Sequence, residues 1–226
     1  MKDLRCGEML GAVFSADYSA VGLSVRVSLL AALVCLFLGT PVALWLARSR
    51  SPGRFVIQLF VLLPLVMPPV AIGFLLLVIL NVAVPSLLFT EVAAVIAATV
   101  AASPLMIRTA QAAMEAVDPR LGKAAATLGA SSGRIFFTIT LPLSWRGLVA
   151  GFTLAWARAF GEFGATMVVA GNIPGRTRTV PLAIWTALQS PGKSPLFFVV
   201  VSILMSVAAV AIGELLVARR PVHRRD

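Results

Sequence analysis

Five long apolar runs dominate this sequence and restrict what it can fold into. They cover residues 22–47, 55–80, 88–108, 147–170 and 196–217. A helix needs about 20 mostly apolar residues to cross the hydrocarbon core of a bilayer, and each run is long enough. Because 59% of all residues are hydrophobic and only 12% are charged, the chain lacks the polar surface of a soluble domain. We therefore predict an all-α bundle of five membrane-spanning helices.

The basic residues gather beside the apolar runs and do not form one stripe. Despite the net charge of +10, this distribution argues against nucleic-acid binding. If the N-terminus lies outside, twelve Lys and Arg residues fall on the cytoplasmic side and five on the outer side. The positive-inside rule favours that orientation. We expect a periplasmic segment at 1–20, a transmembrane domain at 21–217 and a basic cytoplasmic tail at 218–226.

Three closely spaced prolines interrupt the second apolar run. Pro64, Pro68 and Pro69 each remove a backbone donor from a helix. A broken helix at membrane depth is tolerated only where it faces protein or water. Two interpretations follow: a kink that serves helix packing, or a segment that borders a transport pathway.

A capped, half-polar segment separates the third and fourth runs. Asp118 followed by Pro119 is typical of a helix start, and Gly129 is a natural stop because glycine accepts a left-handed conformation. We predict a helix over 119–128 with one small, apolar face. That face is formed by Leu121, Ala124, Ala125 and Leu128. A second element, "RIFFTITL", is expected to end at Pro142 and lead into the fourth span.

A helix of ten residues is too short to be stable alone. It could lie flat on lipid, but its apolar face consists mainly of alanine and contains no Trp or Phe to enter the headgroup region. The remaining interpretation is that the helix docks into a groove on another protein.

The stretch "KAAATLGASSGRIFFTITLP" resembles the conserved cytoplasmic loop of ABC-importer permeases. Six residues match that loop's pattern in type and spacing: Ala124, Ala125, Gly129, Ile139, Leu141 and Pro142. Lys123 departs from the pattern, which has Glu at this position. The resemblance implies that residues 115–142 form a coupling loop whose helix sits in a groove of a cytoplasmic ATPase. Because the chain contains no G-x-x-x-x-G-K-[ST] phosphate loop, the ATPase must be another polypeptide.

A second stretch, "ARAFGEFGATMVVAGNIPGRTRTVPLAIWTAL" at 157–188, is similar to bacterial molybdate permeases. The GEFGA element within it is shared with sulfate permeases, so a sulfate or thiosulfate importer stays as the alternative. The resemblance implies a homodimer in the bacterial inner membrane, two ATPase copies that use ATP and Mg, and a periplasmic molybdate-binding protein. It implies no cofactor in this chain and no means of separating molybdate from tungstate.

Arg158 and Glu162 lie one helical turn apart inside an apolar run. Ionised groups at membrane depth are costly, so they should pair with each other or face water. Two interpretations stay open: a salt bridge that holds the bundle together, or a role in the pathway or its gate. The candidate pathway or gate residues are Arg158, Glu162, Thr166, Pro68 and Pro69.

Two weaker features complete the candidates. Arg176 and Arg178 lie in a predicted outer loop, where they could meet an acidic docking surface or simply be solvated. Gly147 and Gly151 form a G-x-x-x-G pattern that Ala155 extends, and such a row of small residues permits close contact between helices, within one chain or across a dimer axis.

Two other functional classes compete with the permease. A membrane enzyme would need a metal cluster or a catalytic set, yet the single histidine, His223, lies in the basic tail. Cys6 and Cys35 stand alone, without metal-ligand spacing. We therefore expect a non-catalytic chain without a metal site. An ATP-independent carrier is the other rival, but it would have no use for the capped cytoplasmic helix.

Overall fold

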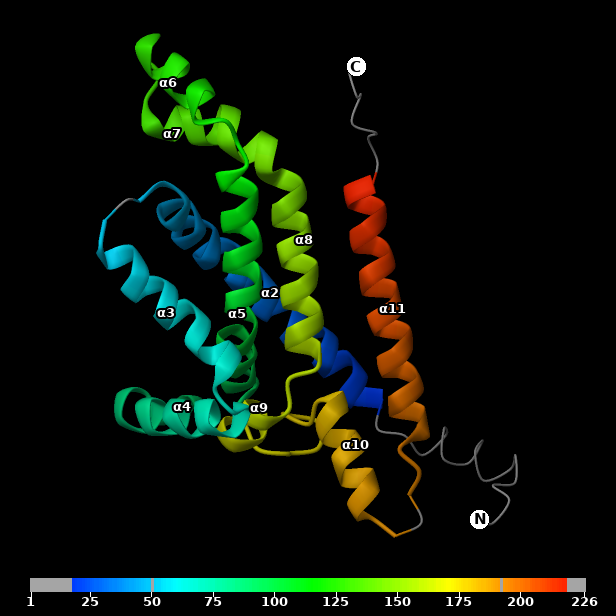
Figure 1. The fold of residues 1–226 in the computed structure, drawn as a ribbon. Coiled ribbons are helices and arrows are strands. Elements are labelled where there is room, and N and C mark those ends of the chain that lie inside the picture. Colours follow the sequence, from blue (N-terminus) through cyan, green and yellow to red (C-terminus); the bar gives the residue numbers. More distant parts are fainter. Residues whose placement is uncertain (1–17, 50, 192, 219–226) are drawn as a thin grey trace.

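The computed structural model describes residues 18–49, 51–191 and 193–218, and within them the chain is helical without strands. Three long helices form the centre: α2 (Tyr18–Arg48), α5 (Glu91–Glu115) and α8 (Leu141–Phe160). A fourth, α11 (Leu196–Ala218), stands beside α8 (Figure 1). Most of the predicted segment 1–20 and nearly all of the tail 218–226 lie outside the described residues.

Small side chains on α5 let the three central helices approach closely. Alanine fills its contact faces, and seven of these residues are almost fully buried: Ala93, Ala94, Ala97, Ala98, Ala101, Ala102 and Ala110. The G-x-x-x-G row packs on the same helix, since a Cβ on Gly147 would lie 2.1 Å from the Cβ of Ala113. The row therefore serves contact between α8 and α5 within one chain.

The second apolar run does not form one straight span. It is divided into α3 (Gly53–Val66) and α4 (Pro69–Ala83), whose axes differ by 114°. The break falls where Met67 is extended, with ψ of 144°, because the residue before a proline is driven out of the helical region. Pro64 lies inside α3 without ending it. The prediction of an interrupted helix is confirmed. The sequence did not predict how large the angle between the two halves would be.

The fourth span begins and ends earlier than the predicted 147–170. A continuous helical stretch runs from Ser132 to Phe160 through α7 (Ser132–Ile135), a π-helical turn η2 (Phe136–Thr140) and α8. The expected stop at Pro142 is wrong, because this proline lies in the first turn of α8. Its missing N–H and its ring disturb the regular hydrogen bonding of the preceding turn, which accounts for the wider π turn there.

The remaining elements are short. A 3-10 turn, η1 (Pro85–Leu87), precedes α5, and α6 (Pro119–Thr127) follows it. After α8 the chain forms α9 (Gly164–Val169) and α10 (Val180–Gln189). Among the described residues, four helices are long and apolar enough to cross a membrane, or five if the bent pair α3 and α4 counts as one span. This range includes the five spans predicted from the sequence.

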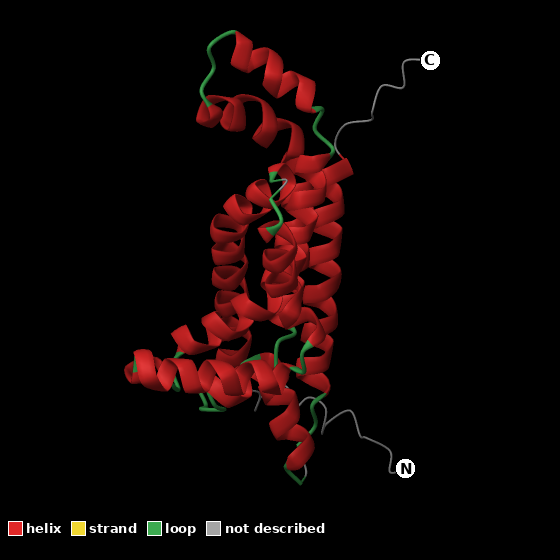
Figure 2. Ribbon diagram, turned by 60° about the vertical axis from the view of Figure 1, so that its left-hand side comes forward, coloured by secondary structure: helices red, strands yellow, loops and turns green. Residues whose placement is uncertain are grey.

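The two ends of the bundle differ in character. At one end α6 and α7 project beyond the long helices, at the same end of the bundle as the C-terminal ends of α2 and α11 (Figure 1). At the other end α4 lies across the bundle together with α9 and α10, and Figure 2 shows both features from a second direction. Because the projecting end carries the basic segments predicted to be cytoplasmic, we refer to it as the cytoplasmic end; the orientation in the membrane stays a prediction.

Candidate functional site

The helix α6 has the start and the stop that the sequence predicted. The Oδ1 atom of Asp118 accepts a hydrogen bond from the backbone N–H of Arg120 at 2.8 Å, and Pro119 occupies the first helical position. Gly129 has φ of +84°, the left-handed conformation that favours glycine. The helix ends at Thr127, one residue before the predicted boundary. Local interactions therefore define both ends of this helix.

The predicted apolar face of α6 is uncovered. Leu128 is 89% exposed and Leu121 is 46% exposed, and Ala124 is exposed between them. Ala125 is half-buried. The side with Gly122 packs instead on α7, because a Cβ there would lie 3.6 Å from the Cγ2 of Ile135. The helix thus rests on α7 with one side and presents the leucines outward.

A cavity of about 460 Å³, lined by both charged and apolar residues, lies between α6 and the ends of α2 and α5. Lys123 lines it together with Asp118 and Ile139. Lys123 is therefore on the side of α6 toward the bundle, away from the apolar face. Of the remaining loop residues, Leu141 and Pro142 form the first turn of α8. The departure from the family pattern at Lys123 changes the charge of this cavity and leaves the exposed face intact.

A polar network that we did not predict closes this cavity. The Nη2 atom of Arg54 lies 2.7 Å from the Oε1 atom of Glu115, which also accepts from Gln111 at 2.9 Å. Gln111 in turn accepts from Arg108 at 3.1 Å. Arg48 donates to the hydroxyl of Thr140. The spacing of Arg108, Gln111 and Glu115 on one helix is a signal that could have indicated the first part of this network.

Arg158 and Glu162 form the ion pair that their spacing predicted. The Nη1 atom of Arg158 lies 2.6 Å from Oε2 of Glu162, whose side chain is 1% exposed. The other carboxylate oxygen accepts from the backbone N–H of Ala165 at 2.9 Å. The carboxylate therefore joins the end of α8 to the start of α9. A role of this pair in a pathway or gate stays a prediction.

The break between α3 and α4 and the break between α8 and α9 lie next to each other, near the carboxylate of Glu162. A Cβ on Gly164 would lie 2.8 Å from the Cβ of Pro69, and a Cβ on Gly73 would lie 2.8 Å from the Cα of Ala165. Thr166 is buried in the same contact region. Pro68 is the N-cap of α4, and its carbonyl accepts a hydrogen bond from the backbone N–H of Ala71. The candidate gate residues lie together in this region, and we call them the elbow site. Its members are Pro68, Pro69, Arg158, Glu162 and Thr166.

The loop between α9 and α10 uses one of its two arginines internally. The Nε atom of Arg178 donates to Oδ1 of Asn172 at 2.8 Å, and Asn172 donates to the hydroxyl of Thr186. Arg176 is exposed. Arg178 therefore stabilises the loop, whereas Arg176 is available at its surface.

Comparisons with known proteins match most of the chain. The family model described as "Binding-protein-dependent transport system inner membrane component" matches residues 39–221. The "Molybdenum transport system permease protein ModB" of Escherichia coli strain K12 is 41% identical over 211 residues, which is 88% of this chain and 92% of that protein. ModB of Haemophilus influenzae is 43% identical over 78% of this chain and 82% of that protein.

A third relative and two solved structures agree with this match. The "Putative molybdenum transport system permease protein YvgM" of Bacillus subtilis strain 168 is 40% identical over 78% of this chain and 82% of that protein. A structure of the MetNI methionine ABC transporter in an inward-facing conformation has a TM-score of 0.75 at 17% identity, covering 89% of this chain and 94% of that one. An amino acid ABC transporter has a TM-score of 0.67 at 16% identity, covering 97% and 99%. At these identities the structures show a shared fold.

Proposed function

Because the chain belongs to the family of binding-protein-dependent transport system inner membrane components, we propose that it is the membrane-spanning permease subunit of an ATP-driven importer of molybdate. The three relatives described above are named for molybdenum transport and are aligned over at least 78% of this chain. Their names support molybdate over sulfate or thiosulfate. Tungstate, which is nearly identical in size and charge, is expected to share the route.

The exposed face of α6 is the observation that carries this proposal. The capped helix projects from the cytoplasmic end and packs on α7 with one side, but its outward face, with Leu128 89% exposed, is not covered by any of the described residues. Exposed apolar side chains on such a rod gain free energy when another protein covers them. An ATP-independent carrier would have no use for this feature. The partner that fits is a cytoplasmic ATPase with a groove for the helix.

The ATPase is proposed to be a separate chain in two copies, one on each α6 of a dimer. The sequence holds no phosphate-binding loop, so ATP and Mg would be bound by that partner while the permease performs no covalent chemistry. Helical structure runs without a break from Ser132 to Phe160, and a short turn at residues 128–131 connects it to α6. A push on α6 would therefore reach Arg158 at the far end of α8 through a stiff element.

The elbow site is the proposed gate. At this site α4 and α9 are in close contact, through Pro69 against Gly164 and through Gly73 against Ala165. A change in the gate would require α4 and α9 either to move as one unit or to break these contacts. Closure of the ATPases would draw the two α6 helices together and turn the spans outward, and hydrolysis would return them. The oxyanion would pass between the two permease subunits by alternating access.

A second copy of the chain is proposed to cover part of α3 and α4. No residue of α3 is buried in the single chain, although the helix is strongly apolar. Broken helices at membrane depth need protein or water beside them, and lipid alone cannot meet that need. On the outer side, Arg176 is available to a periplasmic molybdate-binding protein. The segment at 1–20 and the tail at 218–226 are expected on opposite sides of the membrane.

Stimulated ATP hydrolysis tests the proposal. The permease, its neighbouring ATPase and its binding protein would be reconstituted in vesicles, and molybdate, tungstate and sulfate compared as ligands of the binding protein. We expect molybdate and tungstate to stimulate hydrolysis and sulfate to leave the basal rate unchanged. A matched sample without the binding protein supplies the basal rate.

The alternatives give different results in the same assay. Stimulation by sulfate would retain an importer and replace its substrate. Failure of the permease to assemble with any ATPase would support the ATP-independent carrier instead.

A further inference from the structure

One hydrogen bond ties the cytoplasmic end of α2 to the segment that follows α5. We call residues 118–140, which contain α6, α7 and η2, the coupling segment. Arg48, the last residue of α2, donates to the hydroxyl of Thr140, the last residue of the π turn η2. Within the part of the chain that the structure describes, no other hydrogen bond joins the coupling segment to α2. The transport mechanism proposed above does not use this bond.

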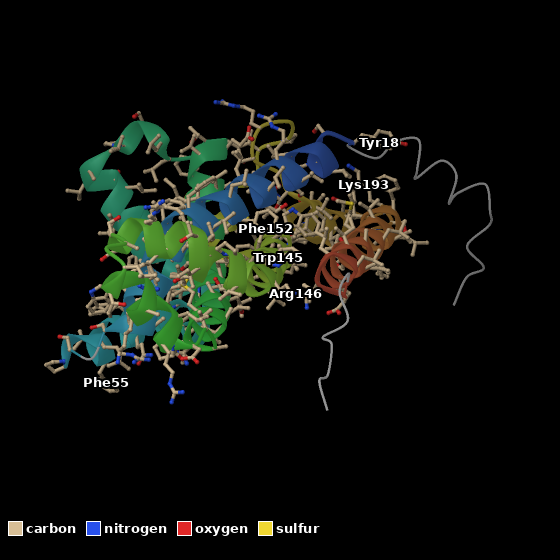
Figure 3. All side chains as sticks on the ribbon, turned by 90° about the horizontal axis from the view of Figure 1, so that it is seen from above. Tyr18, Phe55, Trp145, Arg146, Phe152 and Lys193 are labelled. Carbon is tan, nitrogen blue, oxygen red and sulfur yellow. The ribbon has the colours of Figure 1, made fainter. Side chains whose placement is uncertain are left out.

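The bond lies at the edge of the cavity of about 460 Å³ beneath α6. Arg48 and Thr140 both line this cavity, with Ala47 on the side of α2 and Ile139 on the side of η2. The cavity therefore interrupts the packing between α2 and the coupling segment. After Arg48 the chain leads away from α8, since Figure 3 shows Phe55, near the start of α3, well apart from Trp145 of α8. One long side chain at the end of α2 makes the polar contact.

Thr140 is a firm anchor for that side chain. Arg48 itself is exposed, but Thr140 is only 2% exposed, and its carbonyl accepts a hydrogen bond from the hydroxyl of the equally buried Ser144 at 2.7 Å. A buried hydroxyl group needs a partner, and a guanidinium forms a stronger hydrogen bond than a neutral donor does. π turns within helices are also frequent at functional sites.

The other end of the connection is equally firm, because α2 is part of the core just before Arg48. Leu46 and Ala43 are fully buried, and both belong to the main hydrophobic cluster together with Met106 of α5. Close-packed interiors transmit strain. A force on Arg48 would therefore reach α2 and α5 together.

We propose that Arg48 is a positioning residue of the transport cycle, which makes α2 follow the coupling segment through its bond to Thr140. The inference rests on the proposed function, because it requires an ATPase that moves α6. Without the bond, α8 would still be moved along its continuous helix, whereas α2 would lag behind across the cavity. ATP hydrolysis would then continue with less transport for each ATP.

Molybdate uptake and ATP hydrolysis, measured on the same vesicles with the ATPase and the binding protein present, test this role. Arg48→Leu removes the donor, and Thr140→Val removes the acceptor while keeping a branched side chain. We expect both variants to retain the ATPase on pull-down and the basal rate of hydrolysis. Uptake per ATP should fall about tenfold, the effect of losing one hydrogen bond to a charged group. The double variant should be no worse than either single variant, because both remove the same bond.

Two further variants are the controls. Thr140→Ser retains the hydroxyl and should keep the wild-type uptake per ATP. Thr153→Val, on the same helical stretch, removes a hydroxyl that donates to the carbonyl of Val149 within its own helix, and should also leave this ratio unchanged.

The possible failures are distinguishable. Wild-type uptake per ATP in Thr140→Val would overturn the proposal, even if Arg48→Leu failed to fold. A lower thermal midpoint with an unchanged ratio would also overturn it, since Arg48 would then only stabilise the fold. A wild-type chain that assembles with no ATPase would instead contradict the proposed function, and the role of Arg48 would fall with it.

Discussion

Helix α6 and the elbow site lie at opposite ends of the bundle and are stabilised in opposite ways. No residue of α6 is buried, and its shape depends on its own cap at Asp118 and its own stop at Gly129. The elbow site depends on contacts between distant segments, with Pro69 against Gly164 and a buried carboxylate at Glu162. One region is held by neighbours in sequence, the other by neighbours in space.

This difference matches what each region is proposed to do. A surface that docks a partner must stay uncovered in the free subunit, so its conformation has to be fixed locally. A gate must keep its shape within the membrane, where an unpaired polar group is costly. Substitutions in α6 should therefore impair assembly with the ATPase while leaving the folding of the bundle intact. Substitutions in the elbow site should destabilise the fold itself.

The largest effect is expected from Glu162→Leu. It would leave Arg158 without its counter-ion and Ala165 without its acceptor, and breaking a buried pair costs about 3–5 kcal/mol. The midpoint of thermal unfolding in detergent measures the loss. Glu115→Leu, at a partly exposed ion pair, is the matched control and should cost at most about 1 kcal/mol.

The double variant Arg158→Leu with Glu162→Leu sharpens this result. If the pair only holds the bundle together, the double variant should recover much of the stability and retain transport. A double variant that is stable but inactive would assign the pair to the gate. Equal losses in Glu162→Leu and Glu115→Leu would contradict the description of the elbow site as the more constrained region.

A smaller loss is expected from Gly73→Val. Its side chain would meet the backbone of Ala165, where a Cβ already lies 2.8 Å away, and overpacking costs about 1–3 kcal/mol. Gly22→Val is the control, since no atom lies within 4 Å of a Cβ at that position. Thermal midpoints of the two variants in the same detergent compare them. Identical midpoints would show that α4 and α9 can separate without cost.

Removal of the helix cap by Asp118→Ala should cost about 1 kcal/mol of local helix stability. Because α6 has no buried residue, the bundle should keep its thermal midpoint. Amide hydrogen exchange should become faster in residues 119–127 and stay unchanged in α5. Faster exchange throughout α5 would mean that α6 contributes to the core.

The smallest effect on folding is expected from Leu128→Arg, which replaces a side chain that is 89% exposed. The variant should insert and unfold like the wild type, yet lose the ATPase on pull-down from membranes. Ser51→Arg adds the same charge at the same end, outside the coupling segment, and should retain the complex. Full recovery of the ATPase with Leu128→Arg would contradict docking through this face.

Sequence patterns predicted the local features well and the boundaries of the spans less well. The start of α6 at Pro119 and the left-handed Gly129 were predictable because caps and glycine conformations depend on adjacent residues. The fourth span was misplaced because its apolar run continues through the interruption at 161–163, whereas a helix can end inside such a run. Its earlier start followed from Pro142, which a π turn accommodates without ending the helix.

The sequence by itself determined the membrane location, the helical class and the capped helix α6, and it indicated the ion pair of Arg158 and Glu162 as one of two interpretations. Each depends on composition or on spacing within a few residues, which sets local hydrogen bonding and the cost of transfer into lipid. The tertiary structure decided that α4 turns 114° from α3, that Gly73 and Gly164 join two broken spans, and that Lys123 faces a cavity. These features depend on which small residues of different helices come into contact. The residue pattern within one helix does not identify the helix against which it packs.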